Sequence, residues 1–117
     1  MAYIETMVAA VPTENKAAYL DFAREFGALF IKHGALGTMD SWGSDVPEGK
    51  VTSFPLSVKC EPGETVAVGF IRWPSKAARD KAWEGLMKEP KMQPGAMNMP
   101  FDGKRMIYGG FEVILET

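Results

Sequence analysis

Cysteine and histidine are nearly absent from this sequence, and their scarcity limits its chemistry. The 117 residues include one cysteine, Cys60, and one histidine, His33. A lone cysteine cannot form an internal disulfide, which favours a reducing compartment. His33 has no cysteine or carboxylate cluster at ligand spacing around it, so we expect no metal site and no cofactor.

A surplus of charge and long apolar runs are also missing. The chain carries 13 Lys and Arg against 15 Asp and Glu, a formal net charge of −2, which excludes the basic surface that nucleic-acid phosphates require. No stretch approaches the roughly 18 apolar residues of a membrane span. The first residues lack the basic and apolar regions of a signal peptide. We therefore expect a cytoplasmic protein without nucleic-acid or membrane partners.

The hydrophobic content of 46% is that of an ordinary folded domain, and we expect one domain over residues 1–117. Hydrophobic periodicity predicts strands over residues 3–11, 36–43, 65–73 and 104–116, and helices from a cap at Thr13 to a stop at Gly34 and from a cap at Ser75 to about Pro90. Segment 44–64 holds too many Pro and Gly residues for one regular element. The order β-α-β-β-α-β predicts a ferredoxin-like α+β fold, with two helices on one face of a four-stranded antiparallel sheet and strand 36–43 at an edge.

The second face of this sheet needs a partner. Side chains alternate along each strand, and in the other three strands neither alternating set is polar enough to face water. Each large apolar side chain left in water would forfeit roughly 1.5–3 kcal/mol, and the patch would favour aggregation. Because two helices cover one face only, we expect a homodimer whose two sheets pack face to face.

Four polar residues are expected among the apolar side chains of the uncovered face: Glu5, Arg72, Tyr108 and Glu112. They indicate either a lined pocket or satisfied interface bonds, and an ordinary interface ion pair is the favoured interpretation. In the pocket interpretation, Glu5 is a candidate acid–base group, because a carboxylate among apolar side chains is suited to proton transfer.

Two further stretches are candidates for ligand contact. Asp40 and Trp42 share one side of the edge strand, where a ring substrate could stack on the indole beside the carboxylate, although Trp42 fits a dimer contact equally well. Arg105 could hold an anionic group through two hydrogen bonds. A local pair between Arg105 and Asp102 that fixes the loop is the favoured alternative. Gly109-Gly110 predicts a close approach by a ligand or an aromatic ring.

Two motifs carry a family resemblance: SDVPEGKVTSF over residues 44–54 and MPFDGKRMIYGGFE over residues 99–112. Together with Tyr3, Glu5, Trp73-Pro74-Ser75 and Arg79-Asp80, they resemble the YbaA-like proteins, a bacterial family of unknown function, over essentially the whole chain. The resemblance implies a dimeric α/β barrel. That superfamily includes cofactor-independent monooxygenases, haem-degrading enzymes, dehydratases, isomerases and stress-linked binding proteins. It supplies no established catalytic residue, and haem chemistry is disfavoured because the single histidine is His33.

These observations favour a homodimeric small-molecule-binding protein, and whether it is an enzyme stays open. An enzyme of the monooxygenase, isomerase or dehydratase type would work here without a cofactor. The candidate acid–base groups are Glu5 and Asp40, and the candidate ligand-binding residues are Trp42, Arg72, Arg105 and Tyr108. The alternative is a non-enzymatic module that binds a ligand or a protein partner.

Overall fold

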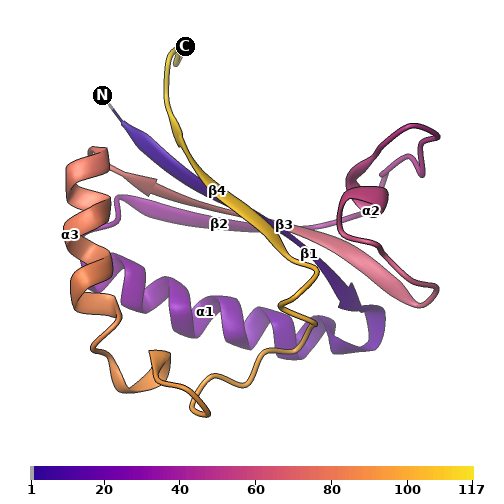
Figure 1. Ribbon diagram of the computed structural model, residues 1–117, viewed down its shortest axis with the longest axis horizontal. Coiled ribbons are helices and arrows are strands. Elements are labelled where there is room, and N and C mark those ends of the chain that lie inside the picture. The colour runs from indigo at the N-terminus through magenta and orange to yellow at the C-terminus, as the bar shows by residue number, and fades with distance from the viewer. Residues whose placement is uncertain (1) are drawn as a thin grey trace.

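The computed structural model describes residues 2–117 and confirms the ferredoxin-like α+β fold (Figure 1). The strands are β1 (Tyr3–Pro12), β2 (Gly37–Trp42), β3 (Glu64–Trp73) and β4 (Ile107–Glu112). The helices are α1 (Lys16–Lys32), α2 (Phe54–Ser57) and α3 (Lys76–Leu86), with single 3₁₀ turns at Thr13–Asn15 and Pro90–Met92. The four strands form an antiparallel sheet in the order β2-β3-β1-β4, which confirms the predicted edge position of β2.

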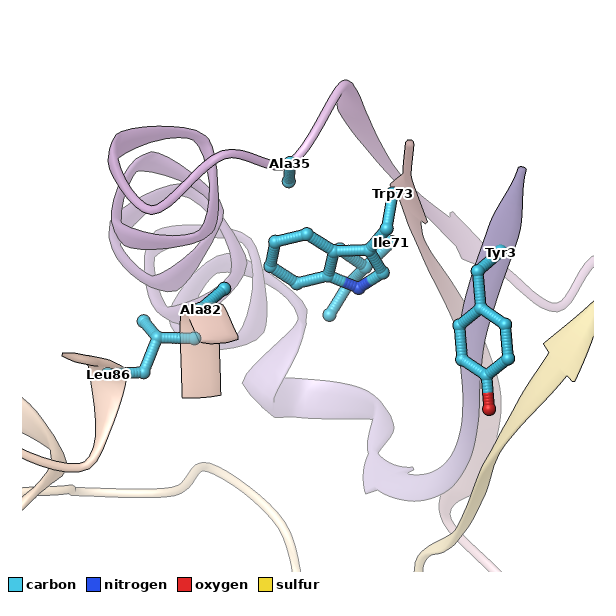
Figure 2. Close-up of a cluster of buried hydrophobic side chains, with 6 residues drawn as sticks. All are labelled: Tyr3, Ala35, Ile71, Trp73, Ala82 and Leu86. Atoms are coloured by element: carbon cyan, nitrogen blue, oxygen red, sulfur yellow. The ribbon is translucent and has the colours of Figure 1, made fainter. Parts of the chain in front are cut away.

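Helices α1 and α3 lie on one face of the sheet, as predicted, and α2 lies on the other (Figure 1). The core between α3 and the sheet is built around Trp73, whose side chain is fully buried and points from β3 toward Ala82 and Leu86 (Figure 2). Ile71 and Tyr3 extend this cluster across β3 and β1. An indole fills this space because its large apolar area outweighs the cost of ordering one side chain.

Local signals explain most element boundaries, but the start of α1, the end of α3 and both ends of β4 differ from the prediction by two or more residues. Ser75 caps α3, because its Oγ accepts a hydrogen bond from the Ala78 amide at 3.0 Å. Thr13 does not cap α1: its hydroxyl pairs with that of Thr65 at 2.7 Å, and α1 begins at Lys16 with no side-chain cap. Helix α3 ends at Leu86, four residues before the predicted stop, where hydrogen bonds between residues three apart replace the helical pattern.

Strand β4 is shorter than predicted because a turn precedes it. The amide of Arg105 bonds to the carbonyl of Asp102 at 3.2 Å, and this turn delays the strand to Ile107. The strand ends at Glu112, and the chain then leaves the sheet, with the Val113 amide bonded to the carbonyl of Ala2 at 3.1 Å.

The uncovered face of the sheet is smaller than the sequence suggested. Helix α2 was not predicted, although its signals are local: Ser53 accepts a hydrogen bond from the Leu56 amide at 3.0 Å, and Pro55 occupies the first turn. The segment after α2 places the buried side chain of Val58 on one end of this face, where it packs with Val8, Ala10 and Val66. The remaining open face carries four exposed apolar side chains: Met39, Phe70, Ile107 and Phe111.

Candidate functional site

An apolar cavity of about 200 Å³ lies between α1 and the sheet. One wall is the aromatic stripe of α1, which the helical period places on the side facing the sheet: Tyr19, Phe22, Phe26 and Phe30. Five methionines, from β1 and from the long connection after α3, line it as well: Met7, Met92, Met97, Met99 and Met106. Thioether side chains adapt to irregular shapes, so this wall suits a ligand of variable outline.

The aromatic wall is held in shape by ring packing. Phe22 lies 4.6 Å from Phe26 and 5.7 Å from Phe101 between ring centroids, the second pair edge to face. Gly27 lets α1 approach β2 closely, because a Cβ there would stand 3.2 Å from the hydroxyl oxygen of Thr38. The cavity is therefore bounded by packed rings on the helix side and by the edge strand on the other.

Asp40 and Tyr19 place one polar pair in this apolar wall. The hydroxyl of Tyr19 donates to Oδ1 of Asp40 at 3.3 Å. Asp40 is exposed because β2 is an edge strand, but its Oδ1 lies against Tyr19 and above Gly69, where a Cβ would come within 2.9 Å of it. Burial raises the pKa of Asp40, and the hydrogen bond from Tyr19 acts in the opposite direction.

Tyr19 itself stays protonated over the whole neutral range. Burial first, and then the neighbouring charge of Asp40, raise the pKa of the phenol above its ordinary value. A carboxylate with a raised pKa beside a fixed hydrogen-bond donor can take up a proton from a bound molecule while the donor stabilises the product. Asp40 was predicted from the sequence as a candidate, whereas Tyr19 was not. The available signal was a hydroxyl on a buried stripe, which needs a partner.

Glu5 lies on the helix-covered face, which corrects its expected grouping with Arg72 on the uncovered face. In the register of the sheet Glu5 stands opposite Ile71, and paired residues point to the same face. Ile71 packs in the core against α3, so Glu5 also points to the face that α1 and α3 cover. Its Oε1 accepts hydrogen bonds from the indole nitrogens of Trp73 at 3.0 Å and Trp83 at 2.7 Å. Its Oε2 lies 3.5 Å from the guanidinium of Arg79. Since Trp83 also lines the cavity, Glu5 holds one of its walls in place.

The other predicted ligand-binding residues do not line the cavity. Trp42 packs beside it, 5.9 Å from the ring of Tyr19, on the helix side of the sheet. Arg72 lies on the open face and pairs with Glu116 at 3.1 Å. Tyr108 and Glu112, which were expected on the uncovered face, stand opposite Met7 and Tyr3 and so lie on the same side of the sheet as Glu5. Tyr108 is on the edge strand β4 and is 76% exposed.

Arg105 is engaged in fixing loops. It makes two hydrogen bonds to the carboxylate of Glu64, at 2.7 and 2.8 Å, one to Asp102 at 3.0 Å and one to the carbonyl of Lys59 at 2.9 Å. The predicted local pair with Asp102 is thus confirmed. The glycine pair of β4 was predicted to allow close approach by a ligand or by an aromatic ring. The structure shows an aromatic ring, because a Cβ at Gly110 would collide with the ring of Tyr3.

Among residues 2–117, the remaining titratable side chains form no second candidate site. Burial and the charge of Glu64 raise the pKa of Cys60, which opposes thiolate formation. Within residues 2–117, no group of three or more His, Cys, Asp or Glu side chains is arranged to hold a metal ion. In the same part of the chain, no helix combines the length and apolar character needed to cross a membrane.

Comparison with known proteins identifies the family. A family model described as "Protein of unknown function (DUF1428)" matches residues 2–103. The chain belongs to this family. It is 47% identical over 116 residues to "Uncharacterized protein YbaA" of Escherichia coli K12, covering 99% of both chains, and equally similar to the Shigella flexneri protein of the same description. The resemblance to the YbaA-like proteins drawn from the two motifs is therefore confirmed.

Two solved structures share the fold of this DUF1428 protein. One is a dimeric ferredoxin-like protein from an uncultured marine organism, with a TM-score of 0.64 and 8% identity, covering 99% of this chain and 98% of the other. The second is a putative antibiotic biosynthesis monooxygenase from Bacillus cereus, with a TM-score of 0.51 and 15% identity, covering 99% and 96%. At such low identities the likeness establishes the fold and carries no function across.

Proposed function

We propose that this DUF1428 protein binds a small apolar molecule in the cavity between α1 and the sheet, and that it does so as a homodimer. One observation supports the binding role above all: an apolar cavity of about 200 Å³ with a single carboxylate–phenol pair in its wall. Concave, mostly apolar sites with a few placed polar groups are the usual form of a small-molecule site. The proposal assigns Asp40 to the site and leaves Glu5 a supporting role.

The binding role is tested by filling the cavity. Ala23 lines it from α1, whereas Ala28 lies exposed on the same helix, so Ala23→Leu and Ala28→Leu form a matched pair. Native mass spectrometry of gently purified protein should reveal an added mass that disappears on denaturation. That mass should be lost in Ala23→Leu and retained in Ala28→Leu. Loss in both variants, or retention in both, would contradict the assignment of the site.

The homodimer rests on the open face of the sheet. Its exposed apolar side chains lie on β2, β3 and β4, and burying them against a second copy would gain roughly 25 cal/mol per Å² of apolar surface. One of the two structural neighbours, the protein from an uncultured marine organism, is described as a dimeric ferredoxin-like protein. The cavity lies on the opposite side of the sheet, so this association leaves it accessible.

Light scattering coupled to size exclusion tests the dimer. Ile107 on the open face is 44% exposed, and Leu20 on α1 is 52% exposed, which makes them comparable apolar sites on opposite sides of the molecule. Ile107→Lys should convert the dimer to a monomer, because it places an unpaired charge in the interface. Leu20→Lys should leave the dimer intact. A wild-type monomer would refute this part of the proposal.

A cofactor-independent enzyme of the monooxygenase, isomerase or dehydratase type is the second candidate, and Asp40 is the observation that favours it. Its raised pKa moves the carboxyl group toward the range in which a general base works near neutral pH. Asp40→Asn keeps the size of the side chain and should abolish turnover of any substrate found, even at ligand concentrations that saturate the cavity. If turnover survives this change, Asp40 is not the base, and a protein that only binds remains.

A further inference from the structure

The size of the cavity limits its ligand to about one ring. A designed cavity of about 150 Å³ lined by Leu, Ile and Phe accepts benzene, and the cavity here is about 200 Å³. Its helix side presents the faces and edges of Phe22, Phe26 and Phe30, against which a planar ring packs well. The space therefore suits a monocyclic, largely apolar molecule with small substituents.

The polar groups around the cavity are few and mostly occupied. Among the described lining residues, the side chains with polar atoms are Tyr19, Thr38, Asp40 and Trp83. The indole N–H of Trp83 is already donated to Glu5 at 2.7 Å, and Thr38 sits where α1 and β2 approach each other. Asp40 and Tyr19 are the two polar groups that lie together in the wall, and the carboxylate is the charged one of this pair.

The charge of the lining discriminates between ligands. No Lys, Arg or His side chain is among the described residues that line the cavity, and the one carboxylic acid among them is Asp40. Both arginines among the predicted ligand-binding residues are engaged elsewhere, Arg72 with Glu116 and Arg105 with Glu64. An anionic ligand would lie beside the carboxylate of Asp40 with no cation among the lining residues to offset the repulsion, which is unfavourable.

The carboxylate retains capacity to accept hydrogen bonds. The bond from Tyr19 is long, at 3.3 Å, and an ionised carboxylate has about four acceptor sites. Gly69 keeps the strand beside Oδ1 free of a side chain, since a Cβ there would lie 2.9 Å from Oδ1 and 3.3 Å from Cγ of Met7. Because Asp40 lines the cavity and keeps acceptor sites, it can receive a hydrogen bond from a bound ligand.

From this arrangement we infer that the ligand is an uncharged single-ring molecule carrying a hydroxyl group, which donates its hydrogen bond to Asp40 beside Tyr19. The inference rests on the proposed function of the same cavity and adds the chemical class of the ligand. The donor is required because a carboxylate only accepts hydrogen bonds. The ring is held by the aromatic wall of α1 and by the methionines opposite.

Four single-ring probes separate the alternatives: toluene, p-cresol, 4-methylanisole and 4-methylbenzoate. They share one methylated ring and present, respectively, no polar group, a donor, an acceptor alone and an anion. Calorimetric titration of the full chain at pH 7 should give p-cresol an affinity about tenfold above that of toluene, the usual scale for a hydrogen bond to a charged group. The anion should bind more weakly than toluene.

Two variants and a control assign this preference. Asp40→Asn should reduce p-cresol affinity about tenfold and leave toluene affinity unchanged. Tyr19→Phe should reduce p-cresol affinity less, since the carboxylate is retained. Asp45→Asn, which changes an exposed aspartate of the 44–63 connection, should alter neither.

The outcomes distinguish this inference from the proposed function. Suppose that toluene binds the wild-type protein but not Ala23→Leu, and that p-cresol binds no more tightly than toluene. The binding site is then correct and the ligand class is wrong. Equal binding of 4-methylanisole and p-cresol would overturn the donor requirement, and tighter binding of 4-methylbenzoate would overturn the charge argument. If no probe binds, both the inference and the binding role of the cavity fail.

Discussion

Replacing Glu5 by alanine should destabilise the fold by about 3–5 kcal/mol, because one carboxylate satisfies three donors at once. The indole N–H of Trp73 is fully buried, and leaving it without an acceptor costs about 1–3 kcal/mol. The half-buried N–H of Trp83 adds about 1 kcal/mol. The guanidinium of Arg79, 19% exposed, loses one of its two acidic partners but keeps Asp80 at 2.8 Å, which limits its share to about 1 kcal/mol.

The conservative change Glu5→Gln separates the hydrogen bonds from the charge. Glutamine keeps an amide oxygen that can accept from both indoles, so only the attraction to Arg79 is lost, and the expected cost is about 1–2 kcal/mol. Figure 2 shows how Trp73 projects into the core beside α3, where water cannot replace the lost acceptor. The two variants should therefore differ by about 2 kcal/mol.

Urea denaturation followed by tryptophan fluorescence and far-UV circular dichroism measures these free energies of unfolding. Glu84→Ala is the control, because Glu84 lies on α3 with its side chain exposed and should change stability by less than about 0.5 kcal/mol. The reasoning would be refuted if Glu5→Gln were as costly as Glu5→Ala, since the ion pair with Arg79 would then dominate. A loss below about 1 kcal/mol for Glu5→Ala would show that the indoles find other acceptors.

Two further predictions concern Glu64 and Gly85. The hydrogen bonds from Arg105 hold the pKa of Glu64 below its ordinary range, so their stabilisation is present above that range and is lost as the pH falls through the lowered pKa. Glu64→Gln should therefore lower the free energy of unfolding by about 1–3 kcal/mol at pH 7 and by progressively less below about pH 4, whereas Glu48→Gln at an exposed site should have no such profile. Gly85→Ala should destabilise by about 1–2 kcal/mol in thermal or urea unfolding, although alanine normally stabilises a helix, because its Cβ would stand 2.7 Å from Nδ1 of His33. If the loss of stability in Glu64→Gln did not depend on pH, the role given to the Arg105–Glu64 hydrogen bonds would be wrong. If Gly85→Ala stabilised the protein, the close contact between Gly85 and His33 would not restrict this position.

Much of the fold was predictable because its determinants are local or periodic. The stripe of α1, the cap at Ser75 and the alternation of β3 all follow from residues close together in the sequence. The order of elements then restricts the sheet to the arrangement seen, with β2 at an edge. Some boundaries were predicted wrongly because they depend on contacts with distant residues. The hydroxyl of Thr13, for example, is hydrogen-bonded to that of Thr65 and does not cap α1.

The candidate site was predictable only in part. Asp40 could be predicted because a carboxylate on a weak edge strand is unusual. Its proximity to Tyr19 could not be predicted, because only the packing of α1 on β2 brings these two residues together. Arg105 illustrates the opposite case. Its ion pair with Asp102, three residues away, was predictable, whereas the stronger bidentate contact with Glu64 spans 41 residues and belongs to the tertiary fold.

The sequence by itself determined which side chains of a strand lie together, because alternation has a period of two and depends on nothing outside the strand. It did not determine how one strand is phased against the next. That phase is the hydrogen-bond register, set by residues far apart in the chain, and a shift of one residue exchanges the two faces. Only the pairing of Glu5 with Ile71, rather than with Arg72, turned this carboxylate inward to the two tryptophans and left Arg72 on the open face.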